Sequence, residues 1–184
     1  MEDWKATHGP KSKNESITFR LDSSTLAKMR KEADEKEVSV NTLVSQIMRN
    51  HVDWHSIAPR AGFISVRRPL VTALLDKHTD EEIKSLAGHI GKTSNRDYLL
   101  LLRNKVSLES AIDFFESWLR ACGFSYKHET PNGFRHSYFI QHDMGKKWSL
   151  YLAVLYQHLF EECNATNFDS DTRENSLSIA FEIP

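Results

Sequence analysis

The chain has 184 residues, enough for one domain or two small ones, and its 24 basic residues nearly balance its 25 acidic residues. Because 40% of the residues are hydrophobic and 10% are aromatic, the chain can build a core, which excludes a wholly disordered protein. The balanced charge indicates no global field that would attract nucleic acid or a membrane surface. Two cysteines, Cys122 and Cys163, are too few for a disulfide framework and are typical of a reducing compartment.

The first fifteen residues, MEDWKATHGPKSKNE, are polar and lack the apolar run of a signal peptide. Apolar runs such as YLLLL at residues 98–102 are far shorter than the roughly 20 residues that a membrane-spanning helix needs. We therefore expect a cytoplasmic protein that does not engage a membrane.

The stretch SITFRL, residues 16–21, alternates polar and apolar residues and follows a segment, 1–14, that we expect to be a flexible arm. A period of two predicts a strand with one buried and one exposed face. The two faces consist of apolar Ile17, Phe19 and Leu21, and of polar Ser16, Thr18 and Arg20. No second strand is predicted nearby, so this strand needs a partner from elsewhere.

Two amphipathic helices are predicted next. Asp22 or Ser23 can cap the first helix, in which apolar residues recur at helical spacing. Ser39 can cap the second, which carries a full apolar stripe of Val40, Leu43, Val44, Ile47 and Met48. From periodicity alone, the segment could be an ordinary helical hairpin with an extended leader.

A dimer would resolve both the missing strand partner and the small size of this region. One strand and two short helices cannot bury their apolar surface as a monomer of roughly 40 residues. Two copies of residues 16–21 can pair antiparallel and place their apolar face on four helices. The polar face of such a two-stranded ribbon fits the major groove of DNA, where hydroxyl and guanidinium groups read base edges.

The stretch SITFRLDSSTLAKMRKEADEKEVSVNTLVSQIMRNHV resembles the ribbon-helix-helix DNA-binding domains of the Arc, MetJ and CopG type. The resemblance covers roughly residues 15–55 and includes the strand, the helix lengths and the SVN at the start of the second helix. It implies a β-α-α unit that forms an intertwined dimer. It also implies two sets of DNA contacts. Ser16, Thr18 and Arg20 would contact the bases. The backbone N–H groups of Ser39, Val40 and Asn41 would bind a phosphate. Helix N-termini bind anions for independent reasons.

The charge of this region departs from what a DNA-binding domain usually carries. Residues 1–58 hold nine Lys and Arg against nine Asp and Glu. Since phosphate contacts supply most non-specific affinity, binding must depend on local placement of Lys5, Lys11, Lys13 and Arg20. We expect modest affinity for a single dimer and a gain when dimers bind side by side as a higher oligomer.

Pro59 and Gly62 break regular structure and place a domain boundary near residues 56–62. We therefore predict a ribbon-helix-helix domain at 15–56 and a ligand-sensing or oligomerisation domain at 57–184. His51 and His55 lie four residues apart on one helix. Their position favours a contact with the helix C-terminal dipole over metal binding.

The second domain is predicted to be α+β, with a small antiparallel sheet covered by helices on one face. A strand at 62–68 leads into a helix from Pro69. A capping box at Thr79 opens a further helix that stops near Gly91, and residues 94–104 fit either a helix or a strand. A helix at 107–123, a hairpin around Asn132, a helix at 146–163 and a second hairpin complete the chain.

Two candidate effector sites lie in this domain. With a turn centred on Asn132, His128 opposes His136 and Tyr126 opposes Tyr138, so the histidines could bind a transition metal, with His142 or Cys122 at the far end. Nickel-responsive repressors form one branch of the family, although the histidine spacing here differs from theirs. The alternative is a pair of hydrogen-bonded, half-buried histidines. A small-molecule cavity could instead be lined by Tyr126, Tyr138, Trp148, Tyr151 and Tyr156, unless these residues are plain core.

The sequence identifies no cofactor and no catalytic motif, since it lacks a P-loop, GxGxxG, GxSxG and HExxH. We expect no enzyme. The preferred hypothesis is a dimeric, sequence-specific transcriptional regulator, in the form of a repressor, that binds double-stranded DNA and responds to a small-molecule or metal effector. The alternatives are an antitoxin-like protein whose C-terminal region binds a protein partner, and a non-specific architectural DNA binder.

Overall fold

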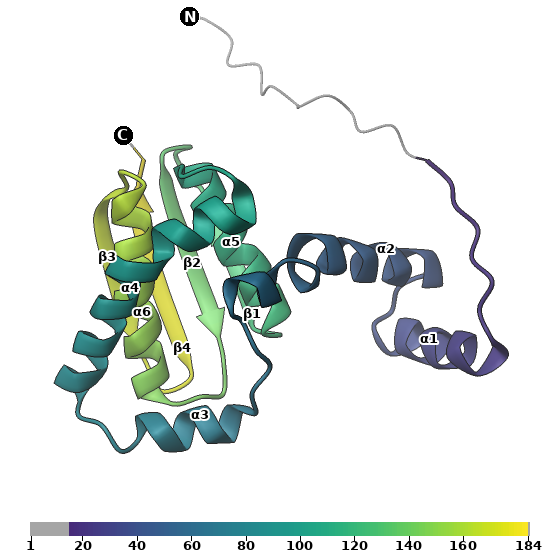
Figure 1. The fold of residues 1–184 in the computed structure, drawn as a ribbon, viewed down its shortest axis with the longest axis horizontal. Helices are drawn as coiled ribbons and strands as arrows, with labels where there is room; N and C mark the ends of the chain where they lie inside the picture. Colours follow the sequence, from purple (N-terminus) through teal and green to yellow (C-terminus); the bar gives the residue numbers. More distant parts are fainter. Residues whose placement is uncertain (1–14, 184) are drawn as a thin grey trace, which may run out of the picture. The chain divides into compact units, whose positions relative to one another are not determined.

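The computed structural model describes residues 15–183, so the arm predicted at 1–14 lies outside the described residues. The chain divides into two compact units, 1–45 and 46–184, and the division falls within helix α2 (Val40–Asn50). The described residues form α-helices and one four-stranded antiparallel sheet (Figure 1). The α+β class predicted from the sequence is confirmed.

In the first unit, both predicted helices form and both predicted caps are present. Helix α1 (Ser23–Glu35) begins after Asp22, whose carboxylate accepts a hydrogen bond from the backbone N–H of Thr25 at 2.8 Å. The hydroxyls of Ser24 and Thr25 also donate to this carboxylate, and these bonds hold the pKa of Asp22 well below its usual range. Helix α2 begins after Ser39, whose Oγ accepts from the N–H of Thr42 at 3.0 Å.

Residues 15–22 form no regular secondary structure in the single chain (Figure 1). None of the backbone N–H groups of residues 16–21 donates a hydrogen bond within the described part of the chain. A strand is stable only when its backbone groups are paired. That a second copy supplies the pairing therefore stays a prediction.

The residues that follow α2 belong to the second unit. The chain continues through one π-helical turn, η1 (His51–His55), and a 3-10 turn, η2 (Ala58–Ala61). Trp54 and Ala58 are buried in the core of this unit, and Arg103 Nη1 donates to the carbonyl of Asp53 at 3.3 Å. The segment thus packs on the second unit before the chain reaches Gly62.

The strand predicted at 62–68 is wrong. Residues 63–67 have no regular structure, and helix α3 (Arg68–Leu75) follows directly. Ile64 is 80% exposed, whereas Phe63 packs edge-on against Trp54 with ring centroids 4.9 Å apart. The ring of Phe63 therefore anchors this connecting segment, and the segment does not pair with the sheet.

Helix α4 (Asp80–Arg103) opens with the predicted capping box between Thr79 and Glu82 but does not stop near Gly91, so that prediction is wrong. The helix continues through residues 94–103. Gly91 is buried, and a Cβ at this position would lie 2.9 Å from Cβ of His158 on α6. The glycine thus permits close packing of two helices and does not end one.

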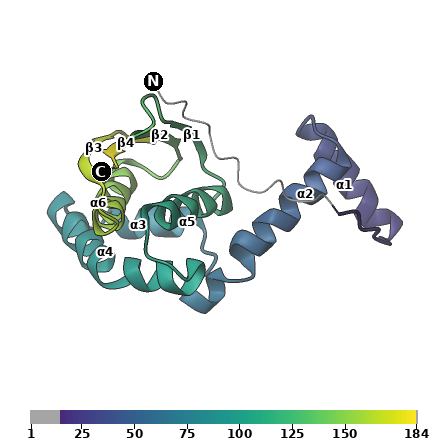
Figure 2. The same ribbon diagram turned by 90° about the horizontal axis from the view of Figure 1, so that it is seen from above.

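The sheet is built from two helix-hairpin units, as predicted. Its elements are α5 (Leu108–Ala121), β1 (Ser125–Glu129), β2 (Arg135–Gln141), α6 (Lys146–Glu162), β3 (Thr166–Thr172) and β4 (Ser176–Glu182). The strand order is β1-β2-β4-β3, and all neighbours are antiparallel. Helices α5 and α6 contact the sheet, and α4 packs on these two helices (Figure 2). Alternate residues of β4, Leu177, Ile179 and Phe181, are buried beneath the helices.

The register of the first hairpin differs from the prediction by two residues. His128 pairs with Tyr138, and Tyr126 pairs with Ile140. The turn is centred one residue later than Asn132, and Gly133 takes the positive φ of 75° that the turn requires. A shift of two residues keeps every side chain on its predicted face, because side chains alternate with a period of two.

Candidate functional sites

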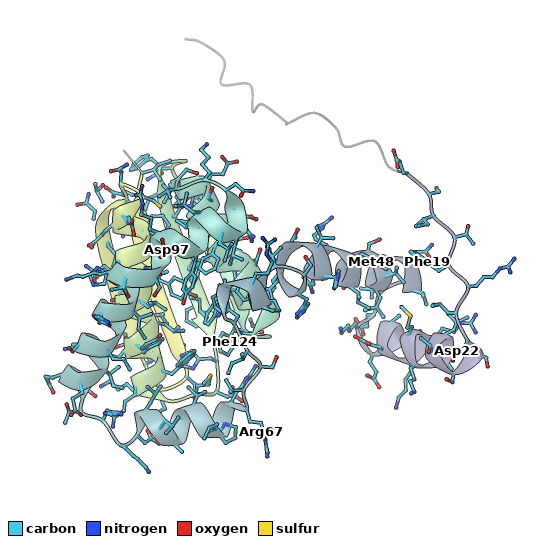
Figure 3. The ribbon with its side chains drawn as sticks, viewed as in Figure 1. Phe19, Asp22, Met48, Arg67, Asp97 and Phe124 are labelled. Carbon is cyan, nitrogen blue, oxygen red and sulfur yellow. The ribbon has the colours of Figure 1, made fainter. Side chains whose placement is uncertain are left out.

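The predicted base-contacting residues, Ser16, Thr18 and Arg20, are exposed and make no side-chain hydrogen bond within residues 15–183. The apolar residues between them are exposed as well. Ile17 is 76% exposed and Phe19, marked in Figure 3, is 47% exposed. In a single chain, both the polar and the apolar side chains of this segment are therefore exposed to solvent.

The apolar stripe of α2 is covered only in part. Leu43 is buried, Val40 and Val44 are half-buried, and Ile47 and Met48 are exposed (Figure 3). Among residues 15–45 the only buried side chains are Ala33 and Leu43. The first unit thus has almost no core of its own.

The predicted phosphate clamp coincides with the start of α2. The cap uses the Oγ and the carbonyl of Ser39, which accept from the N–H groups of Thr42 and Leu43. The N–H groups of Ser39, Val40 and Asn41 donate to no acceptor within the described residues. Free N–H groups at a helix N-terminus carry partial positive charge and bind anions.

The two candidate metal-binding histidines meet despite the shifted register. Nε2 of His128 lies 2.9 Å from Nδ1 of His136, and Nδ1 of His128 lies 3.0 Å from Oε1 of Glu116 on α5. His128 also stacks on the ring of Tyr138, and His136 stacks on Phe181. The sequence predicted the histidine pair, but nothing local to the hairpin indicated that Glu116 would join it.

Glu116 organises the polar groups around this pair. Its carboxylate accepts hydrogen bonds from the hydroxyls of Tyr138 at 3.0 Å and Tyr126 at 3.2 Å, and Arg120 lies 3.4 Å away. Burial raises the pKa of Tyr138, and the nearby carboxylate raises it further, so this hydroxyl keeps its proton and acts as a donor. The cluster is therefore a connected hydrogen-bond network between α5 and the first hairpin.

The structure places the two other candidate ligands elsewhere. His142 is buried, and its Nε2 lies 2.8 Å from Oγ of Ser149 on α6. Cys122 lies at the end of α5, where burial raises the pKa of its thiol to about 11. Among residues 15–183 no group of three His, Cys, Asp or Glu side chains has the geometry to hold a metal ion. The histidine pair thus offers two nitrogens and no third protein ligand there.

The five aromatic residues predicted to line a cavity mostly serve the core. Tyr138 and Tyr156 are buried, and Tyr156 packs on Phe115 with ring centroids 4.2 Å apart. Trp148 and Tyr151 stack on each other. A cavity of about 370 Å³ does lie in the second unit, with Trp148 on its wall, but its other walls come mainly from residues 54–71 and from α5. Sequence reasoning missed these walls because they meet only in the folded unit.

No protein-family model, curated protein or solved structure matches the chain. Function is therefore inferred from the residues and their geometry alone. Within residues 15–183, none of the helices combines the length and the apolar character needed to cross a membrane.

Proposed function

We propose that the protein is a dimeric, sequence-specific DNA-binding transcriptional regulator that acts as a repressor. Two copies of residues 16–21 pair as an antiparallel ribbon, and this ribbon enters the major groove of DNA. The second unit, with its own packed core, carries the effector response.

The observation that carries this proposal is the incomplete first unit. A region that buries only Ala33 and Leu43 cannot offset the entropy of ordering about 30 residues. Its exposed apolar residues are not scattered, since Ile17, Phe19 and Leu21 alternate along one segment. Such an apolar row is expected when a second copy covers it.

The polar row of the same segment supports the choice of DNA as the partner. Hydroxyls of Ser16 and Thr18 can donate to or accept from base edges, and the guanidinium of Arg20 can form a bidentate pair with guanine. A ribbon with three such side chains per strand reads sequence, whereas a purely electrostatic binder would need an excess of basic residues.

The start of α2 supplies the complementary contact with the DNA backbone. Three free N–H groups at Ser39, Val40 and Asn41 match the needs of a phosphate oxygen. Phosphate contacts fix the orientation of a protein on the duplex while base contacts set its specificity. The two sets of residues therefore have separate and separately testable roles.

The antitoxin-like alternative is less well supported. A region that folds only on a protein partner exposes much of its apolar surface when alone. Here Phe115, Phe160 and Phe181 are fully buried without a partner. The nearly balanced charge of residues 1–58 likewise argues against a non-specific architectural binder.

The test of this function selects bound duplexes from a randomised library and measures their affinity by fluorescence anisotropy at one fixed salt concentration. Arg20→Ala should reduce the preference for the selected duplex over a scrambled one by about tenfold. Arg30→Ala is the matched control, because it removes the same charge from an exposed position of α1. Equal behaviour of the two variants, or no enrichment of any sequence by wild type, would overturn the proposal.

A second pair of variants tests the phosphate clamp. Val40→Pro deletes one free N–H at the first position of α2, where proline fits the helix. Val40→Ala shortens the same side chain but keeps the N–H. We expect Val40→Pro to weaken binding to selected and scrambled duplexes by a similar factor, relative to Val40→Ala.

A further inference from the structure

The cavity of about 370 Å³ lies wholly within the second unit, beside the start of α3 and the end of α5. Figure 3 marks Arg67, which precedes α3, and Phe124, which follows α5. The size is at the lower end of the range for small-molecule sites and suits a ligand of one or two rings. Its walls are rich in aromatic and sulfur-containing side chains, namely Trp54, Phe63, Trp118, Phe124, Met144 and Trp148.

The polar groups on the walls are nearly all hydrogen-bond donors or bases. No Asp or Glu lines the cavity, whereas Arg68 and His55 do. The indole N–H of Trp148 is buried and has no hydrogen-bond partner among the described residues. A buried donor without a partner costs free energy, and a small rotation of this indole toward the cavity would let an acceptor on a ligand satisfy it.

Existing contacts hold the side chain of Arg68 in place and leave some of its N–H groups free to donate hydrogen bonds. Nη1 bonds the carboxylate of Asp143, Nη2 donates to the carbonyl of Cys122 at 2.8 Å, and the guanidinium lies 5.1 Å from the ring centre of Phe124. A guanidinium has five N–H donors. Several donors therefore remain for an anion while the existing contacts fix the orientation of the side chain.

We propose that this cavity binds a small aromatic carboxylate. The aromatic walls hold the ring, Arg68 binds the carboxylate, and the indole N–H of Trp148 bonds an acceptor of the same ligand. This assignment deepens the proposed function by naming the class of effector, and its regulatory meaning rests on that function. Binding of the ligand to the second unit does not depend on the proposed function, so this binding can be tested without DNA.

The position of the cavity in the chain suits an effector site. Trp54 and His55 line the cavity and belong to the π-helical turn η1, which begins at the residue after the end of α2. A ligand seated here would touch the turn that directly follows the helix carrying the predicted phosphate clamp.

The experiment titrates the full-length protein with three probes of the same ring size, which are 2-naphthoate, 2-naphthamide and 2-naphthylmethylamine. Two-dimensional ¹H–¹⁵N NMR follows the indole N–H of Trp148, identified by its absence in Trp148→Phe, and calorimetry gives the dissociation constants. We expect a saturable shift of the Trp148 indole signal with 2-naphthoate, weaker binding of the amide and no saturable binding of the amine. No saturable shift with 2-naphthoate, or an equal response to the amine, would overturn the proposal.

Two arginine variants sharpen the result. Arg68→Gln should raise the dissociation constant of 2-naphthoate by about tenfold or more, because a charge-assisted hydrogen bond is lost. Arg67→Gln should change it less than about twofold, since Arg67 is exposed and does not line the cavity. Equal effects of the two substitutions would show non-specific attraction. The probe series on wild type still decides the question if Arg68→Gln does not fold. A DNA measurement with and without 2-naphthoate then reports on regulation separately.

Discussion

Between residues 15 and 45 only Ala33 and Leu43 are buried, whereas the second unit encloses whole aromatic rings such as Phe115 and Phe160. Both regions have helices with well-formed caps, so local structure does not separate them. The difference lies in what covers the apolar side chains. The second unit closes its core with its own helices and sheet, and the first leaves a row of apolar residues for something else to cover.

The two regions therefore differ in the packing that their helices need in order to be stable. A helix of 11 to 13 residues, such as α1 or α2, is marginal in water without packing on an apolar face. The second unit supplies that packing within one chain. In the proposed dimer the first unit depends on a second copy, so its stability should depend on protein concentration while that of the second unit should not.

The largest effect is expected from emptying the core of the second unit. Phe115→Ala should lower the free energy of unfolding by about 3–5 kcal/mol, because Phe115 is fully buried and packs on Tyr138, Tyr156 and Phe160. Phe139→Ala, at an exposed position of β2, should cost far less. Urea unfolding measures both. A small loss for Phe115→Ala would mean that the core is not packed as described.

The next effect concerns the dimer. Phe19 and Phe134 are both 47% exposed in the single chain, which makes them a matched pair. Phe19→Ala should weaken dimerisation by about tenfold or more, because each dimer would lose two buried rings. Phe134→Ala should leave dimerisation unchanged. Sedimentation equilibrium distinguishes these results, and equal dissociation constants for the two variants would refute the ribbon.

Two glycines of α4 test the packing of that helix on α6. Gly91→Ala places a methyl group 2.9 Å from Cβ of His158 and should cost about 1–3 kcal/mol. At Gly88 the nearest atom is Nε2 at the far end of the same side chain, 3.4 Å away. Gly88→Ala should be nearly neutral, since the small crowding opposes a gain in helix propensity of about 1 kcal/mol. Thermal unfolding measures both variants, and the reverse order would contradict the packing.

The smallest effect is a pH dependence of the second unit. Burial lowers the pKa of His136 below its ordinary value of 6.5, and the neighbouring His128 lowers it further while Glu116 opposes the shift. The unfolded chain then binds more protons than the folded one, so stability should fall as the pH drops below about 6.5.

His136→Gln should make this dependence shallower but not abolish it, because burial also lowers the pKa of His142. Urea unfolding at pH 7.5 and pH 5.0 compares wild type with the variant. An unchanged or steeper dependence in the variant would show that His136 does not titrate in this way.

Several features of the fold could be read from the sequence because they depend on neighbouring residues. Asp22, Ser39 and Thr79 each cap a helix through a bond to a residue three positions away. The alternation of one helix and two strands likewise follows from local periodicity. These interactions join residues that are close together in the sequence, so the local sequence pattern predicts them.

Other features depend on residues far apart in the chain. Gly91 permits the approach of His158, and its sequence context alone made it look like a helix end. Glu116 joins the histidine pair because of how α5 lies on the hairpin. The cavity beside Arg68 exists only once the segment after η2 folds back on α5. Sequence reasoning found the residue types for such sites but not their neighbours.

The central claim is that residues 16–21 pair with the same segment of a second copy. Amide hydrogen exchange followed by NMR on the full chain, at protein concentrations above and below the dimer dissociation constant, tests it most directly. We predict protection at alternate residues of the segment that rises with protein concentration, because alternate N–H groups pair in a two-stranded antiparallel ribbon. Fast exchange of all these amides at every concentration would contradict the ribbon and the proposed reading of DNA.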